Sequence, residues 1–217
     1  MTPPPAADAR RIEVDPARIV RWVAGFTERH GALRWSVDAG AVVLAAADGS
    51  TAVLTALAPG GPTPSGPEGL GAWASAPATV GLVLVRRGGY AVGLAEGDRL
   101  VAHKVGTRYV QSRTAAGGWS QQRYARRRGN QADALVEAVA DHAARLVVSG
   151  RPQAVVVGGD RAMVRDVLAE EAVSDLAGLP RRELYDLPDP RMAVLERALA
   201  RGRAVRVRLE EAVPAPA

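Results

Sequence analysis

Several residue types are missing or scarce in this chain of 217 residues, and each gap bears on the kind of protein it is. There is no cysteine, which excludes disulfides, thiol nucleophiles and thiolate metal sites. Aromatic residues make up only 4% of the chain, so a core has to be built mainly from valine, leucine and alanine. No apolar run reaches the roughly 18 residues of a membrane-spanning helix. The N-terminus lacks the parts of a signal peptide, so we expect a cytoplasmic protein without a membrane partner.

Acidic residues are absent from one long stretch, Arg99–Ala132. The whole chain has a net charge of +5, yet this stretch alone is more basic than that, so the remainder is net acidic. Its basic residues are Arg99, Lys104, Arg108, Arg113, Arg123, Arg126, Arg127 and Arg128. Such a concentration of charge favours a site for a polyanion. Two plainer interpretations stay open: a solvated arginine face, and the arginine bias of a GC-rich genome.

The first third of the chain is expected to hold two parts. Residues 1–14 are rich in proline and predict a disordered lead. Residues 15–70 predict a small α+β region, with a helix over 16–30 followed by short strands. The segment 59–67 is dense in proline, glycine and serine, which indicates a linker and a domain boundary.

Residues 78–212 predict one larger domain. A β-meander over 79–112 precedes a long helix over 120–147, and strands and helices then alternate up to a final strand at 204–209. The turn Gly158-Gly159-Asp160 follows a buried strand, and Asp160 is placed to cap the next helix. This order of elements implies a mixed sheet covered by helices. The long helix is predicted from an apolar stripe: Ala132, Leu135, Val139, Ala143 and Leu146.

Conventional catalytic groups are few. The three histidines, His30, His103 and His142, have no metal-ligand spacing, and no nucleophile elbow or P-loop is present, so no metal or cofactor is expected. His142 lies next to Asp141 in the long helix and is interpreted as structural. The basic stretch contains no carboxylates, which argues against a two-metal nuclease there. A nuclease with carboxylates clustered elsewhere on the sheet is kept as a third hypothesis.

The loop Gly117-Gly118-Trp119-Ser120-Gln121-Gln122 remains as the candidate site. Its glycines allow the backbone to approach a ligand closely, and free N–H groups at the helix start can bind an anion or an oxyanion. Glutamine can orient a water but has no pKa suited to a general base. The loop therefore suits a labile ester held by a partner that supplies the positioning. On chemistry alone, a plain glycine-rich connection is an equal alternative.

The loop and the residues after it resemble the Gly-Gly-Gln loop and helix of the eukaryotic and archaeal class-1 peptide release factors. That family shows Gly-Gly-Gln-Ser, an Arg-Phe/Tyr pair and further arginines. The residues that fit without a gap are Ser120, Arg123, Tyr124, Ala125, Arg126 and Arg128. In this register Trp119 stands in the place of the catalytic glutamine. The loop is also similar to the Gly-Gly-Ser-Gln of the Vms-like branch, above all its actinobacterial-type group. In that register Trp119 is an insertion and Gln121 is catalytic.

The resemblance covers roughly residues 78–212 and implies both a fold and a reaction. The fold is the RNase H-like α/β fold of the release-factor middle domain, here preceded by the small α+β region. The reaction is hydrolysis of the ester between a nascent peptide and tRNA on the large ribosomal subunit. Gln121, or Gln122 as second choice, would hold the water beside Gly117 and Gly118. Residues expected to contact rRNA and tRNA are Lys104, Arg108, Arg113, Trp119, Arg123, Arg126, Arg127 and Arg128.

The resemblance implies the large subunit and peptidyl-tRNA as partners, and we expect a monomer. No stop-codon-reading domain is evident in the sequence. A second hypothesis is a non-catalytic ribosome- or RNA-binding module with a degenerate loop, and Trp119 is the residue that favours it.

Overall fold

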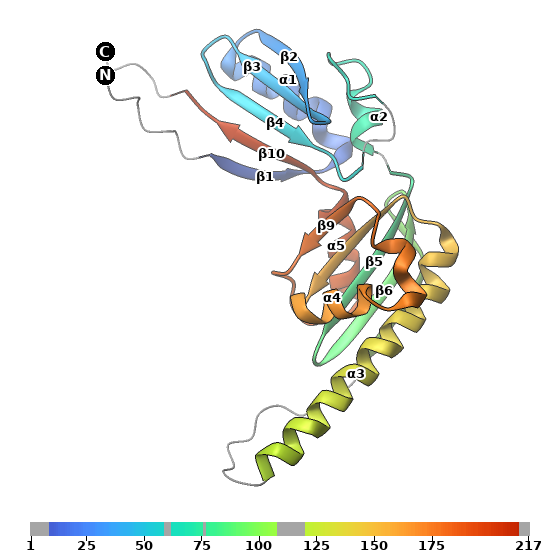
Figure 1. Ribbon diagram of the computed structural model, residues 1–217. Coiled ribbons are helices and arrows are strands. Elements are labelled where there is room, and N and C mark those ends of the chain that lie inside the picture. The colour runs from blue at the N-terminus through green and yellow to red at the C-terminus, as the bar shows by residue number, and fades with distance from the viewer. Residues whose placement is uncertain (1–8, 59–61, 76, 108–119, 213–217) are drawn as a thin grey trace. The chain divides into compact units, whose positions relative to one another are not determined.

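The computed structural model describes residues 9–58, 62–75, 77–107 and 120–212, and only the backbone of residues 120–130. The chain divides into two compact units (Figure 1). The terminal unit combines residues up to Pro77 with the C-terminal segment from Arg203, and the central unit runs from Ala78 to Gly202.

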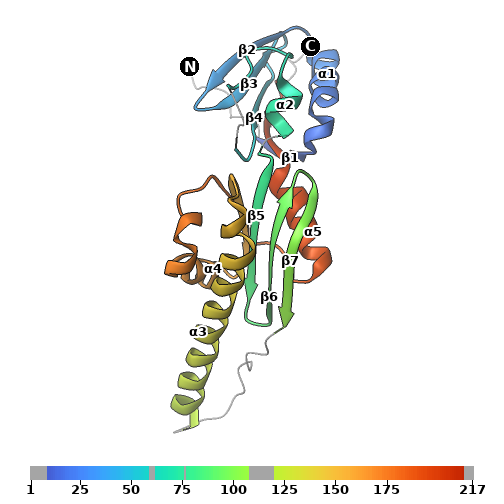
Figure 2. The same ribbon diagram turned by 90° about the vertical axis from the view of Figure 1, so that its right-hand side faces the viewer.

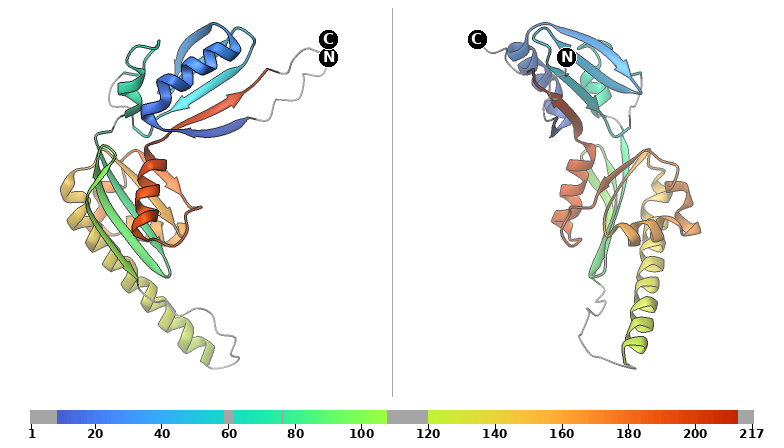
Figure 3. Two further views of the ribbon diagram at one scale, coloured as in Figure 1. Left: turned by 180° about the vertical axis from the view of Figure 1, so that it is seen from behind. Right: turned by 60° about the vertical axis from the view of Figure 1, so that its left-hand side comes forward.

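The terminal unit is an antiparallel sheet with helices on one face. The strand order is β1 (Arg10–Val14), β10 (Val205–Glu210), β4 (Thr51–Thr55), β3 (Ala41–Ala46) and β2 (Leu33–Asp38). A single 3-10 turn, η1 (Pro16–Arg18), leads into α1 (Ile19–His30), which lies across the sheet (Figure 3). Helix α1 buries Ile19, Val23 and Phe26 against the apolar side chains of the strands. Val20 also belongs to the apolar pattern that predicts this helix, but it is exposed.

The termini of the chain depart from the sequence pattern. The pattern puts residues 10–14 in a disordered lead, but they form β1 and pair with β10 from Arg10↔Leu209 to Val14↔Val205. The pattern also puts the final strand in the domain 78–212, whereas β10 lies between β1 and β4 of the terminal unit. Both differences have one cause, because each of these strands is stabilised by a partner far away in the sequence.

The boundary between the units also differs from the expected one. It lies between Pro77 and Ala78, not within the segment 59–67. A short helix, α2 (Leu70–Ser75), buries Leu70 and Trp73 in the core of the terminal unit. The chain therefore still belongs to the terminal unit after the proline-rich segment.

The central unit contains a mixed sheet. Its order is β7 (Arg99–Thr107), β6 (Gly89–Glu96), β5 (Thr79–Arg86), β8 (Ala154–Gly159) and β9 (Arg181–Leu184) (Figure 2). The first three strands form the predicted antiparallel meander, and β8 and β9 run parallel to β5. A five-stranded order in which the second strand alone runs opposite to the rest is the RNase H-like arrangement. The predicted fold class is confirmed.

Helices cover both faces of this sheet. One face carries α3 (Ser120–Leu146), α4 (Arg161–Leu168) and the 3-10 segment η3 (Glu171–Leu176), which share a core with Val83 and Val157. A second 3-10 turn, η2 (Val148–Gly150), follows α3. The other face carries α5 (Met192–Arg203), where a Cβ on Gly202 would meet Val156. Strands β5 and β8 are buried on both faces, which explains their nearly continuous apolar sequences.

Candidate functional site

The predicted site falls on the connection between β7 and α3. Strand β7 ends at Thr107 and α3 begins at Ser120. Five of the predicted site residues lie outside the described part of the chain: Arg108, Arg113, Gly117, Gly118 and Trp119. The first turns of α3 contain the predicted residues Gln121, Gln122, Arg123, Arg126, Arg127 and Arg128. The backbone of these turns is helical, and the helix continues through Gly129 and Asn130.

Helix α3 is held to the sheet by its C-terminal half. Three residues of the predicted stripe, Leu135, Val139 and Ala143, are fully buried in the core of the central unit, and the other two, Ala132 and Leu146, are partly buried. The N-terminal half extends beyond the end of the sheet (Figures 1 and 2). At 1.5 Å per residue, Gln121 lies about 21 Å along the helix axis from Leu135. The glutamines and arginines therefore lie on the N-terminal half of α3, which extends away from the hydrophobic core.

The beginning of α3 is suited to an anion. The first four N–H groups of a helix have no acceptor within the helix, and the aligned peptide dipoles place about half a positive charge at this end. The first turn of α3 contains no acidic residue that would compete for these groups. A phosphate or a developing oxyanion at this end would be stabilised by the helix itself.

Lys104 is the member of the predicted RNA-contacting set whose side chain the structure describes, and it is exposed on β7. It pairs in register with Val92, whose side chain belongs to the core under α3. On α3 itself, Arg145 donates a hydrogen bond to Nδ1 of His142 at 2.8 Å, and the His142 ring stacks on Tyr90 with centroids 5.4 Å apart. The interpretation of His142 as a structural residue agrees with these contacts. Tyr90 and Arg145 were not predicted as partners of His142, although the i, i+3 spacing of His142 and Arg145 indicates that those two side chains share one side of the helix.

The pKa of His142 is lowered from its ordinary value. Partial burial is the largest cause, and the positive charges of Arg145 and Lys104 act in the same direction, whereas Asp141 opposes them. The bond from Arg145 gives a structural reason, since a guanidinium can only donate and Nδ1 must therefore stay unprotonated to accept. His142 is neutral at pH 7 in this surrounding.

Acid should therefore destabilise the central unit through His142. The unfolded chain takes up the proton first, at the ordinary pKa of 6.5, because the folded pKa lies lower. Stability should be level above about pH 7 and fall as the pH drops below 6.5 toward the folded pKa. A His142→Phe variant keeps an aromatic ring against Tyr90 and should lose less stability between pH 7.5 and 5.5. Urea unfolding at three pH values measures this, and an identical pH dependence in both proteins would contradict it.

Asp160 caps the next helix as predicted, whereas Gly158 and Gly159, predicted as part of a turn, are the last residues of β8 and pair with β5. Oδ1 of Asp160 accepts hydrogen bonds from the backbone N–H groups of Ala162 at 3.0 Å and Met163 at 3.2 Å. The start of α4 is thus capped by the protein's own carboxylate. In addition, the guanidinium of Arg161 lies over the ring of Tyr185, 4.1 Å from its centroid.

Two kinds of feature are absent from the described residues. They contain no group of three or more histidine, aspartate or glutamate side chains placed to hold a metal ion. None of their helices has the length and apolarity needed to span a bilayer.

The fold and the sequence of the site together define a class of protein: an RNase H-like domain in which a Gly-Gly sequence precedes a helix rich in arginine. The family model described as "Actinobacteria/chloroflexi VLRF1 release factor" matches residues 78–208, and the chain belongs to this family. The match spans more than half of the chain and includes the loop and all of α3. The predicted family is confirmed. No curated protein matches the sequence significantly.

Solved structures resemble the chain more distantly. The "Vms1 mitochondrial localization core" is 11% identical, with a TM-score of 0.44 and coverage of 91% of this chain and 83% of that one. The archaeal translation termination factor aRF1 is 14% identical, with a TM-score of 0.39 and coverage of 91% and 66%. RuvC of Thermus thermophilus is 18% identical, with a TM-score of 0.31 and coverage of 58% and 91%. Family membership rests on the match of residues 78–208.

Proposed function

We propose that the chain is a peptidyl-tRNA hydrolase of release-factor type, which frees nascent peptide from tRNA on stalled or obstructed large ribosomal subunits in the cytoplasm. The observation that carries the proposal is the family match over residues 78–208, which includes the Gly-Gly loop. Membership of a release-factor family implies an interaction with the ribosome. The polyanion that the basic stretch is expected to bind would then be rRNA and tRNA.

In the proposed reaction, the side chain of Gln121 holds a water beside the ester carbonyl. The water adds to the carbonyl carbon, and the tetrahedral intermediate collapses with loss of the tRNA ribose oxygen, which gains a proton as the water loses one. N–H groups at the start of α3 and around Gly117 and Gly118 would stabilise the negative charge on the carbonyl oxygen. No side chain in the loop has to act as a base, because the role of the glutamine is only to position the water. Gln122 is the second choice for this role.

The arginines of α3 have a separate role in the proposal. Arg123, Arg126, Arg127 and Arg128 would contact phosphates of rRNA and tRNA and direct the loop into the peptidyl transferase centre, together with Arg113, Trp119, Lys104 and Arg108. Because α3 is anchored from Leu135 onward, its first turns can enter a narrow RNA-lined site while the sheet stays outside. We expect the protein to act as a monomer.

The experiment that tests the function is peptide release from purified large subunits carrying labelled peptidyl-tRNA. We expect the native chain to release the peptide, with a rate that falls as salt rises from 50 to 200 mM, because phosphate contacts release counterions. Free peptidyl-tRNA without subunits is the control and should be cleaved far more slowly. A chain that binds the subunits at low salt but leaves the ester intact would refute the proposal.

That outcome would support the second candidate, a non-catalytic ribosome-binding module. The observation that favours it is Trp119, which stands in the place of the catalytic glutamine in the ungapped register. Co-sedimentation with subunits at low salt without ester cleavage is the result this candidate predicts.

A further inference from the structure

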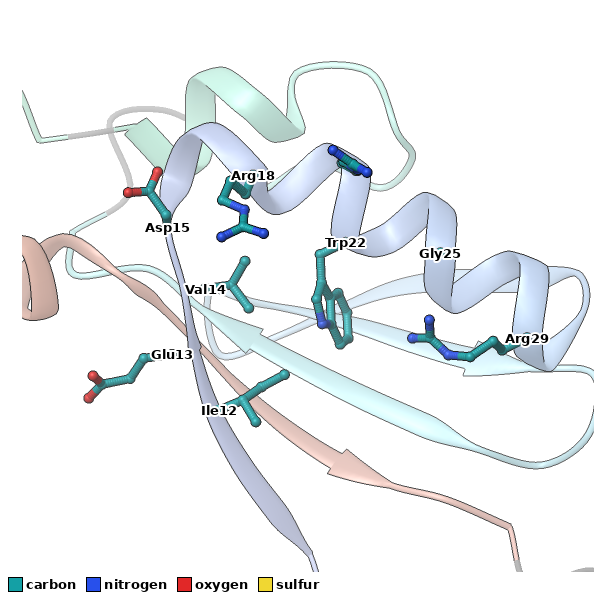
Figure 4. A pocket seen from close by; sticks show the side chains of 9 residues that line it. Ile12, Glu13, Val14, Asp15, Arg18, Trp22, Gly25 and Arg29 are labelled. Carbon is teal, nitrogen blue, oxygen red and sulfur yellow. The ribbon is translucent and has the colours of Figure 1, made fainter.

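A groove in the terminal unit lies outside the residues that match the family, and the proposed hydrolysis does not use it. It runs between α1 and the edge strand β1 and has a volume of about 470 Å³ (Figure 4). Its helical side is formed by Arg18, Arg21, Trp22, Gly25 and Arg29. Its floor on β1 includes Ile12 and Val14, which continue into the core of the unit.

The three arginines of the groove have free guanidinium groups within the described part of the chain. No hydrogen bond or ion pair joins the side chain of Arg18, Arg21 or Arg29 to another described residue. Other arginines of the terminal unit differ in this respect: Arg208 pairs with Glu210 at 3.1 Å, whereas Arg10, Arg11 and Arg34 also have no partner among the described residues. Three unpaired guanidinium groups along one groove leave a positive surface that an anion can satisfy.

The spacing of the arginines determines how far the positive charge extends along the groove. Arg18 and Arg29 are eleven residues apart, so they span about 16 Å along the helix axis. Gly25 lies between them, and a Cβ built on it would be 3.4 Å from Nη1 of Arg29. The guanidinium of Arg29 therefore folds back over Gly25 toward Trp22. The positive charge is arranged as a line, which suits a chain of several anionic groups better than a single ion.

The two acidic residues of the groove do not neutralise this line. Side chains alternate along β1, and Figure 4 shows Glu13 on the side of the strand opposite Trp22 and Arg18. Oδ1 of Asp15 accepts the N–H of Ala17 at 2.8 Å and thereby caps η1. Glu13 is thus directed away from the groove, and Asp15 keeps its negative charge but is held at the start of η1, so the lining still has an excess of positive charge.

An aromatic surface completes the groove. The Trp22 ring is stacked on the fully buried ring of Phe26, with centroids 5.5 Å apart and planes 9° apart. This contact fixes the indole, and its partly exposed remainder lines the groove. A fixed aromatic ring beside a line of arginines is the combination that binds single-stranded nucleic acid, with bases on the ring and phosphates on the cations.

We propose that this groove binds a short segment of single-stranded RNA, with Arg18, Arg21 and Arg29 on its phosphates and one base against Trp22. The groove is a second RNA contact, made by a different unit from the one that carries the Gly-Gly loop. An acidic peptide satisfies the charges but makes no use of the aromatic ring, so RNA is the occupant that accounts for both features.

The test uses the full chain and a fluorescein-labelled ten-nucleotide oligouridine, with binding followed by anisotropy between 50 and 300 mM NaCl. Replacing all three groove arginines, Arg18→Gln, Arg21→Gln and Arg29→Gln, should reduce the slope of log affinity against log salt by about 2, at about 0.7 per phosphate contact. The arginines of α3 are present in every protein, so the difference isolates the groove. Trp22→Leu should weaken binding about tenfold without changing the slope.

The matched control is Arg11→Gln, Arg34→Gln and Arg208→Gln, which removes the same charge from exposed residues on the opposite face of the same sheet. This variant should keep the native slope. Equal losses in the two triple variants would overturn the proposal in favour of non-specific attraction, as would a native slope in the groove variant. Displacement of the RNA from the native chain by a ten-residue glutamate peptide at equal concentration would also overturn it, in favour of a protein ligand.

Circular dichroism of each variant establishes that it is folded. Oligouridine binding is measured without subunits or peptidyl-tRNA, so a failure of the proposed hydrolysis and a failure of the groove give different results.

Discussion

Replacement of Gln121 by alanine should slow peptide release on large subunits by about 100-fold, the usual cost when a reacting group, here the water, is no longer held in position. The loss should appear in the single-turnover rate and leave subunit binding unchanged, because alanine removes the amide but none of the arginines. Position 121 lies far from the buried residues of α3, so the variant should fold normally. Single-turnover release with saturating protein measures the effect.

Gln122→Ala is the matched control, since it removes the same side chain one residue further on. We expect it to keep most of the activity. A normal Gln121→Ala with an inactive Gln122→Ala would move the role by one residue. Normal release by both variants would exclude glutamine from the reaction.

The register of the loop can be tested through Trp119 itself. If Trp119 is an insertion, its deletion leaves Gly-Gly-Ser-Gln and should preserve release. If Trp119 instead replaces the catalytic glutamine, the native chain should be inactive and Trp119→Gln should gain activity. The two interpretations thus predict opposite results for the same pair of variants.

Replacement of Gly159 by alanine should destabilise the central unit by about 3 to 5 kcal/mol, among the larger effects of a single substitution. Gly159 has φ of 103°, which L residues with a Cβ rarely adopt, and a Cβ there would clash with the backbone carbonyl of Val85. The oxygen of that carbonyl accepts the N–H of Asp160 at 2.8 Å, at the end of the parallel pairing of β5 and β8. The clash would therefore separate the central strands of the sheet.

Gly178→Ala is the control, because a Cβ on Gly178 would meet nothing within 4 Å, and its effect should stay within about 0.5 kcal/mol. Urea unfolding followed by circular dichroism gives the free energies. Hydrogen exchange in β5 and β8 assigns the loss to the central unit. A Gly159→Ala protein as stable as Gly178→Ala would show that the end of β8 can relax.

Much of the central unit was predictable because its signals are local. The apolar stripe of Leu135, Val139 and Ala143 specifies which side of α3 is buried, and all three residues are fully buried. The cap at Asp160 needs only the two N–H groups that follow it. In such cases each residue interacts with neighbours within about one helical turn, and the sequence contains both partners side by side.

The terminal unit was predicted less well because its pairing is not local. Strand β1 contains two arginines and a glutamate, so its composition resembles that of a solvated segment. It is a strand because Ile12 and Val14 pair with Val207 and Val205, nearly the whole chain away. Many registers with other strands have similar apolar patterns, and only the packed sheet selects among them.

The sequence by itself determined the chemistry of the candidate site: a Gly-Gly loop, two glutamines and a run of arginines without acids, cysteine or histidine. It also determined the helix that follows, since both features are contiguous. The tertiary structure decided where that helix is anchored, which strands complete each sheet, and that Arg18, Trp22 and Arg29 line one groove with β1. These properties depend on burial, and burial depends on which distant segments a residue packs against.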